Sequence, residues 1–199
     1  MFTTLNNIRI LAESDTLFSD GTFKTVPNQF LQLFTIHGIV RQFVFPFVFC
    51  LTAKKNEHTY NTIYNELKNY AVNNHLTLSP RYAVSDFEIA IMNACRAAFP
   101  EVTLTGCLYH YTQSIWRQVV SKGLRELYLD IQQPTIRQQI QQILALPFIP
   151  LQDVQEVWEL LYDNMQEEII ELASYVETTY VTGRPARGRR RAVPPRFAP

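Results

Sequence analysis

The sequence lacks the features that mark a membrane protein or a secreted protein. No stretch approaches the roughly 18 uncharged apolar residues that a membrane-spanning helix requires, and the apolar run at residues 43–53 is much too short. The N-terminus has no basic segment followed by an apolar block and a small-residue cleavage site. We therefore expect an intracellular protein, in the nucleus or the cytoplasm, without a membrane partner.

Paired cysteines are also missing. The three cysteines, Cys50, Cys95 and Cys107, are odd in number and show no paired spacing. This argues against a disulfide framework and favours reduced thiols.

Charge is balanced in total but not along the chain. Six of the 18 basic residues lie in the last 16 positions, which contain no acidic residue. Residues 1–183 therefore carry 12 basic and 18 acidic side chains. Because an acidic body binds nucleic acid poorly without specificity, a DNA-binding role would depend on the tail, on local patches or on further parts.

The 199 residues, 47% of them hydrophobic, suffice for one domain with a sizeable core and a tail. β-Branched and aromatic runs predict strands at residues 16–20, 30–40, 42–53, 82–85 and 102–108. Apolar residues at three- and four-residue spacing predict helices at residues 56–74, 87–99 and 109–120. The order of three strands, helix, strand, helix, strand, helix predicts an α/β, ribonuclease H-like mixed sheet, whose first and fourth strands lie side by side.

The rest of the chain is predicted to be helical and then irregular. Amphipathic helices are expected at residues 135–146, 151–165 and 167–180. From residue 182 onward Gly, Pro and Arg dominate, which predicts a flexible tail. We expect a core domain at residues 1–122, an all-helical segment at 123–181 and the tail at 182–199. Trp116 and Trp158 lie on apolar stripes and are expected in the core.

Two aspartates follow short apolar runs, Asp20 in L-F-S-D-G-T-F and Asp86 in Y-A-V-S-D-F-E. Alone, Asp20 before a glycine is most often a turn former. Asp86 alone is most often a helix N-cap, with Glu88 pointing along the first turn. Together, at the ends of neighbouring parallel strands, two carboxylates suit a two-metal site that clamps a phosphodiester.

Ordered motifs across residues 16–180 resemble the transposases of Mutator-like elements (MULEs), whose catalytic domain is a DDE recombinase of the ribonuclease H-like fold. The matching stretches are D-G-T-F-K-T-V-P at 20–27, Q-L-F-T-I-H-G at 32–38, F-P-F-V-F-C-L at 45–51, S-D-F-E at 85–88, F-P-E-V at 99–102, G-C-L-Y-H-Y-T-Q-S-I-W-R at 106–117 and A-L-P-F-I-P at 145–150. The resemblance implies metal-dependent DNA cleavage and strand transfer.

The resemblance also assigns roles to residues. Asp20 and Asp86 match the first and second catalytic acids and would ligate Mg²⁺ or Mn²⁺. Cys107 and His110 match the family's C-x-x-H element. The family's third acid, a Glu in a segment resembling N-x-x-E-G-W-H, has no counterpart here, so we expect a C-terminally truncated and inactive relative. The implied partners are DNA, at the transposon ends, and a second copy in a homo-oligomer.

Other residues have alternative interpretations. Cys107 and His110 supply only two of the four ligands of a closed zinc site, so we favour a structural role over zinc. Five glutamates that could replace the missing acid are expected on the solvated faces of helices: Glu156, Glu159, Glu167, Glu168 and Glu171.

The basic tail leaves a second hypothesis open. Its cation cluster is of the kind that binds phosphates or an import receptor, or else it is a solvated loop; its residues are Arg184, Arg187, Arg189, Arg190 and Arg191. The alternative to a transposase fragment is therefore a non-catalytic derivative that binds nucleic acid or protein.

Overall fold

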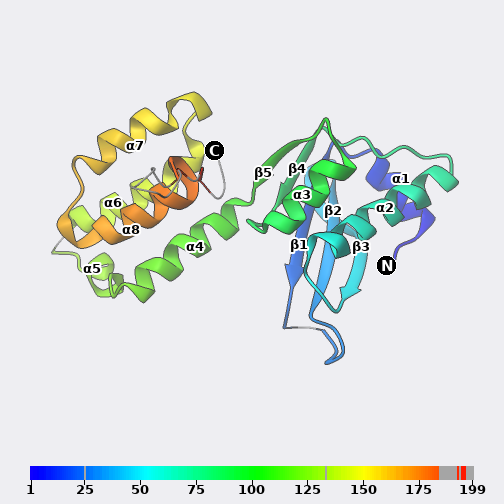
Figure 1. Ribbon diagram of the computed structural model, residues 1–199, viewed down its shortest axis with the longest axis horizontal. Helices are drawn as coiled ribbons and strands as arrows, with labels where there is room; N and C mark the ends of the chain where they lie inside the picture. Colours follow the sequence, from blue (N-terminus) through cyan, green and yellow to red (C-terminus); the bar gives the residue numbers. More distant parts are fainter. Residues whose placement is uncertain (25, 133, 184–191, 193, 196–199) are drawn as a thin grey trace. The chain divides into compact units, whose positions relative to one another are not determined.

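The computed structural model describes residues 1–24, 26–132, 134–183, 192 and 194–195. The chain divides into two compact units, Met1–Cys107 and Leu108–Pro199. All five strands belong to the first, the sheet unit, and the second, the helical unit, contains helices α4 to α8 (Figure 1). Most of the predicted tail at residues 182–199 lies outside the described residues, including Arg184, Arg187, Arg189, Arg190 and Arg191.

The sheet is mixed and has the strand order β3-β2-β1-β4-β5. Its strands are β1 (Thr16–Thr22), β2 (Gln32–Val40), β3 (Phe43–Thr52), β4 (Tyr82–Ser85) and β5 (Thr103–Gly106). β1, β2 and β3 form an antiparallel meander, whereas β4 runs parallel to both β1 and β5. The carboxyl ends of β1, β3, β4 and β5 therefore lie at one edge of the sheet, which we call the carboxyl edge.

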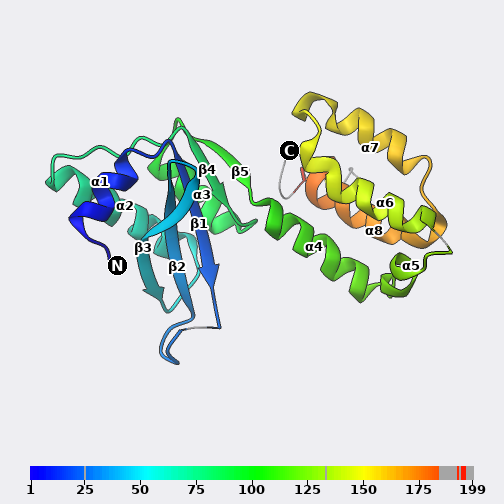
Figure 2. The same cartoon turned by 180° about the vertical axis from the view of Figure 1, so that it is seen from behind.

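Two helices cover one face of the sheet, α2 (Glu57–Asn73) and α3 (Ile89–Ala98), as the two opposite views show (Figures 1 and 2). The helix period seen in the sequence explains this packing. The α2 residues Tyr60, Ile63, Tyr64, Leu67 and Ala71 are buried on one stripe. Asn56 caps α2 by accepting a hydrogen bond from the Thr59 amide at 2.9 Å.

A short helix that was not predicted from the sequence, α1 (Leu5–Ala12), lies at the start of the chain. Thr4 caps it by accepting a hydrogen bond from the Asn7 amide at 3.1 Å. Ile8 and Leu11 are its only buried residues, and both belong to the hydrophobic core of the sheet unit. Two apolar positions in eight residues are too few to give a clear period.

The helical unit contains five α-helices and four single-turn segments within the described residues. The α-helices are α4 (Leu108–Ser121), α5 (Arg125–Leu129), α6 (Pro134–Ala145), α7 (Val154–Tyr162) and α8 (Ile170–Val176). The short segments are η1 (Leu146–Phe148), η2 (Leu151–Asp153), η3 (Glu167–Ile169) and η4 (Glu177–Val181). Helix α5 was not predicted from the sequence, and η3, α8 and η4 follow one another where one continuous helix was expected.

The fourth helix packs within the helical unit. The Tyr111 hydroxyl of α4 donates a hydrogen bond to the Ile143 carbonyl at 2.8 Å, and Ser114 and Tyr180 hydroxyls lie 2.7 Å apart. These contacts bind α4 to α6 and to η4. The compact units therefore divide at residue 107, whereas the proposed family domains, with a boundary at residue 122, stay a prediction.

The two tryptophans differ in burial. Trp158 in α7 is 1% exposed, as predicted. The expectation for Trp116 is wrong, because this side chain is 36% exposed and packs against the Tyr128 ring at a centroid distance of 5.1 Å. Its stripe on α4 is only partly covered.

The predicted α/β, ribonuclease H-like mixed sheet followed by a helical segment is confirmed. Among the described residues, no helix is both long and apolar enough to cross a membrane.

Candidate functional site

The two predicted acids lie next to each other at the carboxyl edge. Ser19 of β1 pairs with Ser85 of β4 in the parallel register, and Asp20 and Asp86 directly follow these two serines in the sequence. Neighbouring strands lie about 4.8 Å apart, so the backbones of the two acids are close. Both side chains are half-buried. This arrangement follows from the position of the first and fourth strands in the sheet.

The turn after β4 orients Asp86. An Oδ1 atom of Asp86 accepts a hydrogen bond from the Glu88 backbone amide at 3.1 Å. Helix α3 begins only at Ile89, so Glu88 is the residue before the helix. The expectation that Glu88 points along a first helical turn is therefore wrong.

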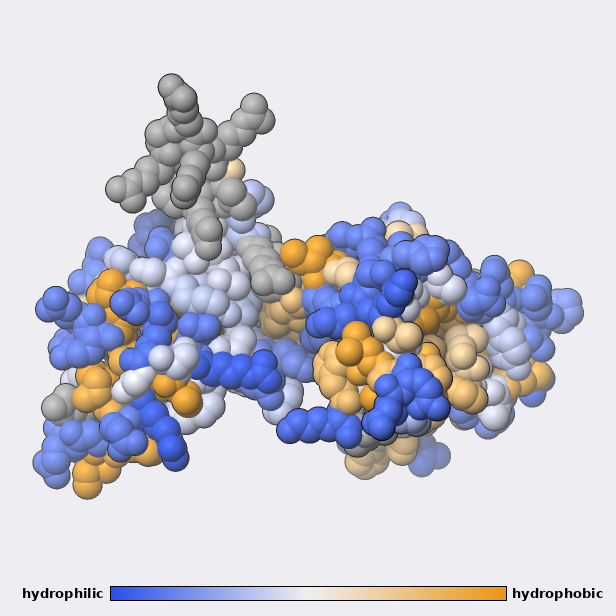
Figure 3. All heavy atoms as spheres, turned by 60° about the horizontal axis from the view of Figure 1, so that its bottom comes forward, coloured by the Kyte–Doolittle hydropathy of each residue, from blue (hydrophilic) through white to orange (hydrophobic). Residues whose placement is uncertain are grey.

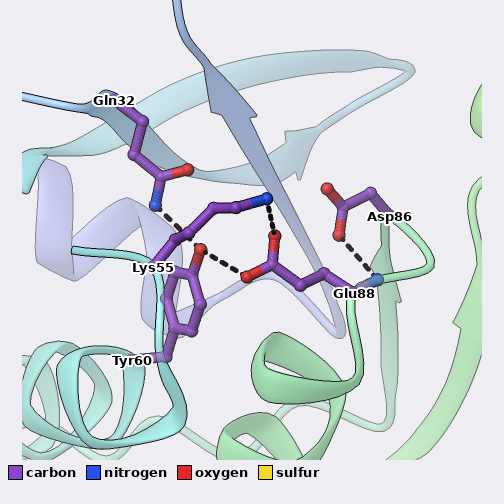
Figure 4. Close-up of polar contacts among 5 residues, drawn as sticks. All are labelled: Gln32, Lys55, Tyr60, Asp86 and Glu88. Carbon is purple, nitrogen blue, oxygen red and sulfur yellow. Dashed lines mark hydrogen bonds and ion pairs between the residues drawn. The ribbon is translucent and has the colours of Figure 1, made fainter.

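The Glu88 carboxylate instead turns toward Lys55 and Tyr60 (Figure 4). The Tyr60 hydroxyl donates a hydrogen bond to Glu88 Oε1 at 3.1 Å, and Lys55 Nζ lies 3.5 Å from Glu88 Oε2. The Gln32 amide nitrogen donates to the Tyr60 hydroxyl at 2.8 Å. Four side chains from β2, the β3–α2 loop, α2 and the β4–α3 turn thus form one polar network next to Asp86.

Burial determines the protonation of Tyr60 in this network. It raises the pKa of the Tyr60 hydroxyl, the Gln32 hydrogen bond lowers that pKa in part, and the charge of Glu88 raises it further. Tyr60 therefore stays protonated at neutral pH and can donate to Glu88. In β2, opposite Phe18, burial lowers the pKa of His37, although its backbone hydrogen bond with Phe18 and the charge of Asp20 act in the opposite direction.

The other candidate residues do not take part in this network. The Cys107 amide donates a hydrogen bond to the Ser85 carbonyl at 2.7 Å, so Cys107 also lies at the carboxyl edge, next to the strand end that carries Asp86. Cys107 is the last residue of the sheet unit and His110 lies in the first turn of α4, in the helical unit. The structural role of this pair stays a prediction. The five glutamates considered as replacements for the third acid are all exposed, as predicted: Glu156, Glu159, Glu167, Glu168 and Glu171.

The candidate site is distinct from the hollow in the sheet unit. A hollow of about 440 Å³ lies at the opposite end of β4 and β5, lined by Lys68 and by residues 78–82 and 98–103. It contains neither acid. Throughout the described ranges, no group of three or more His, Cys, Asp and Glu side chains is placed to hold a metal ion.

The comparisons with known proteins support the resemblance to transposases. Residues 16–114 match the family described as the MULE transposase domain. The predicted resemblance is thus confirmed over this segment, which contains Asp20, Asp86, Cys107 and His110. No curated protein matches the chain.

Among solved structures, the chain is similar to one described as the Drosophila P element transposase strand transfer complex, with 11% sequence identity and a TM-score of 0.32. The likeness covers 86% of this chain and 52% of that chain. The present chain therefore spans about half the length of that transposase chain.

Proposed function

We propose that the chain is part of a DDE-type transposase and that Asp20 and Asp86 hold a divalent metal ion, Mg²⁺ or Mn²⁺. The observation that carries the proposal is the pairing of Ser19 with Ser85, which brings the next residue of each strand to one edge. Both acids also lie inside the segment that matches the MULE transposase domain. Carboxylate oxygens fit these hard cations.

The chemistry that such ions supply is activation of a water or a 3′ hydroxyl and stabilisation of charge on the phosphodiester. The chain's own contribution is to hold and orient two of the ligands. The Glu88 amide donates a hydrogen bond to one Asp86 oxygen, and this bond fixes the orientation of the carboxylate. In this proposal the substrate is DNA at transposon ends, handled by a homo-oligomer.

We further propose that this chain does not cleave DNA by itself. The described residues offer no third acid grouped with Asp20 and Asp86, and Glu88 is engaged by Lys55 and Tyr60. A phosphoryl-transfer site with two acidic ligands would lose much of its electrostatic stabilisation.

Titration with Mn²⁺, followed by electron paramagnetic resonance of the free ion, tests the metal site. We expect weak binding that Asp20→Asn and Asp86→Asn each abolish. Asp15→Asn is a matched control because Asp15 precedes β1 at the opposite end of the strand. Binding that survives both site substitutions would contradict the proposal.

A nicking assay with plasmid DNA tests the proposed inactivity. We expect no cleavage in Mg²⁺ or Mn²⁺. Metal-dependent nicking that disappears in Asp86→Asn would show that this chain is an active nuclease.

A non-catalytic DNA-binding derivative is the second candidate. Three lysines favour it: Lys24 follows β1, and Lys54 and Lys55 follow β3, so all three lie in loops at the carboxyl edge. DNA binding by a chain that does not bind Mn²⁺ would favour this candidate over the first.

A further inference from the structure

Lys55 is a cation that two fixed groups hold at the carboxyl edge. Its ammonium lies 3.5 Å from Glu88 Oε2 and 5.4 Å from the centroid of the Phe23 ring. Phe23 comes three residues after Asp20, and Glu88 comes two residues after Asp86. The segments that carry the two acids therefore also carry the two groups that hold the lysine.

A buried hydrogen-bond chain anchors this arrangement. Tyr60 and Gln32 are both 0% exposed, and they fix Glu88 through bonds of 3.1 and 2.8 Å in series. Figure 4 shows the chain running from Gln32 through Tyr60 to Glu88, with Lys55 on the other Glu88 oxygen. The buried residues Gln32 and Tyr60 thus fix Glu88, and Glu88 in turn restricts the position of Lys55.

The ion pair itself is a poor explanation for this anchoring. The Lys55 side chain is 50% exposed, and exposed ion pairs contribute little to stability. The separation of 3.5 Å is also longer than a good N–H···O hydrogen bond. Because an ammonium has three donors, Lys55 keeps the capacity to bind a second anion from solvent while Glu88 and Phe23 restrict its position.

The surroundings indicate which anion fits. Lys24 and Lys54 are exposed in loops at the same edge, so an extended polyanion would meet three cations there. In the space-filling view the part of the molecule that holds the sheet shows apolar side chains between strongly hydrophilic ones (Figure 3). Exposed apolar residues such as Phe23 and Leu31 in the β1–β2 connection suit contact with sugars and bases beside the phosphates.

We propose that Lys55 binds a phosphate of the DNA strand that lies over Asp20 and Asp86, and that Glu88 and Tyr60 are positioning residues for this lysine. The proposal rests on the proposed DNA-directed function. It adds a specific contact and a reason for the buried network.

Lysine footprinting on the full chain tests it. The chain has five lysines, and acetylation of each can be followed by mass spectrometry with and without a 20-nucleotide single-stranded DNA. We expect DNA to slow acetylation of Lys55 at least fivefold and to leave Lys122 unchanged. Lys122 is a matched control because it also pairs with a glutamate, Glu171, at 3.1 Å. DNA binding without protection of Lys55, or equal protection of Lys122, would overturn the proposal.

Variants separate positioning from folding and from the metal site. Tyr60→Phe and Glu88→Gln should each reduce the protection of Lys55 at least twofold, with circular dichroism unchanged. Lys68→Gln, beside the hollow at the opposite end of β4 and β5, should leave the protection as in the parent. Unchanged protection in both positioning variants would refute the role of the network. Mn²⁺ binding measured on the same samples distinguishes failure of this inference from failure of the proposed function. If Asp86→Asn abolishes Mn²⁺ binding but DNA does not protect Lys55 in the parent chain, only the inference about Lys55 is refuted.

Discussion

The sheet unit and the helical unit differ in how their charges are balanced. Residues 1–107 contain eight basic and eight acidic side chains, whereas residues 108–183 contain four basic and ten acidic ones. The excess of negative charge over residues 1–183 therefore lies in residues 108–183, and the six arginines of residues 184–199 offset it in the helical unit as a whole. In the sheet unit, where the lysines of the carboxyl edge lie, the charges already balance within residues 1–107.

Their polar interiors differ as well. In the sheet unit, buried Gln32 and Tyr60 pass hydrogen bonds outward to Glu88, beside Asp86. In the helical unit, the bonds of Tyr111 and Ser114 join one helix to another. Polar groups of the first unit thus support an exposed edge, while those of the second support packing. This difference is consistent with the proposed placement of the metal site in the sheet unit.

Core truncation should produce the largest effects and should separate the two units. Phe34→Ala in β2 removes a side chain that is 0% exposed, and Trp158→Ala in α7 removes one that is 1% exposed. Each should lower the free energy of unfolding by about 3–5 kcal/mol. Hydrogen exchange measured by mass spectrometry should show faster exchange in peptides of the substituted unit. Equal loss of protection in both units, from either substitution, would show that they unfold as one.

Adding a methyl group at a glycine should give a smaller effect that also differs between the units. A Cβ on Gly106 of β5 would collide with the Phe87 ring, and Phe87 lies between Asp86 and Glu88. Gly106→Ala should cost about 1–3 kcal/mol and weaken Mn²⁺ binding, because the Asp86 turn must shift. Denaturant unfolding and Mn²⁺ titration measure the two effects.

Gly123 supplies the control in the helical unit. Its φ of +71° is unfavourable for alanine, and a Cβ there would meet no atom within 4 Å. Gly123→Ala should cost about 1 kcal/mol through backbone strain and leave Mn²⁺ affinity unchanged. An equal change of affinity in both variants would contradict the assignment of the metal site to the sheet unit.

Local patterns in the sequence predict the fold better than they predict the site network. Strands β2 and β3 follow from runs of β-branched and aromatic residues, and the Tyr60 stripe follows from helix periodicity. The placement of Asp20 and Asp86 follows from strand order, because parallel neighbours bring equivalent ends together. Helices α1 and α5 are too short to give a clear period.

The contacts of Glu88 could not be predicted in the same way. Its partners Tyr60 and Lys55 are 28 and 33 residues away in the sequence. Whether they meet depends on how α2 and the β3–α2 loop lie against the β4–α3 turn, which local periodicity does not determine. A lysine pair and a glutamate after Asp-Phe are the only signals, and both are common on solvated surfaces.

Thiol reactivity should give the smallest effect. It reports on the sheet unit alone because all three cysteines lie there, whereas both tryptophans lie in the helical unit. Burial raises the pKa of Cys50 and of Cys95 from 9.0 to about 11. At pH 8 both should react slowly with a disulfide reagent, whereas half-buried Cys107 reacts first. Peptide mapping after timed labelling identifies each thiol, and labelling of Cys50 as fast as that of Cys107 would contradict the burial.

The direction of the pKa shift also predicts how stability depends on pH. A raised pKa means that the folded sheet unit favours the neutral thiols, so their contribution is complete below about pH 9 and is lost as the pH rises toward 11. Tryptophan fluorescence follows only the helical unit, so a pH series that combines it with thiol labelling measures each unit separately. If the fluorescence signal is lost at a lower pH than the one at which Cys50 and Cys95 become reactive, the helical unit is the less stable of the two units at high pH.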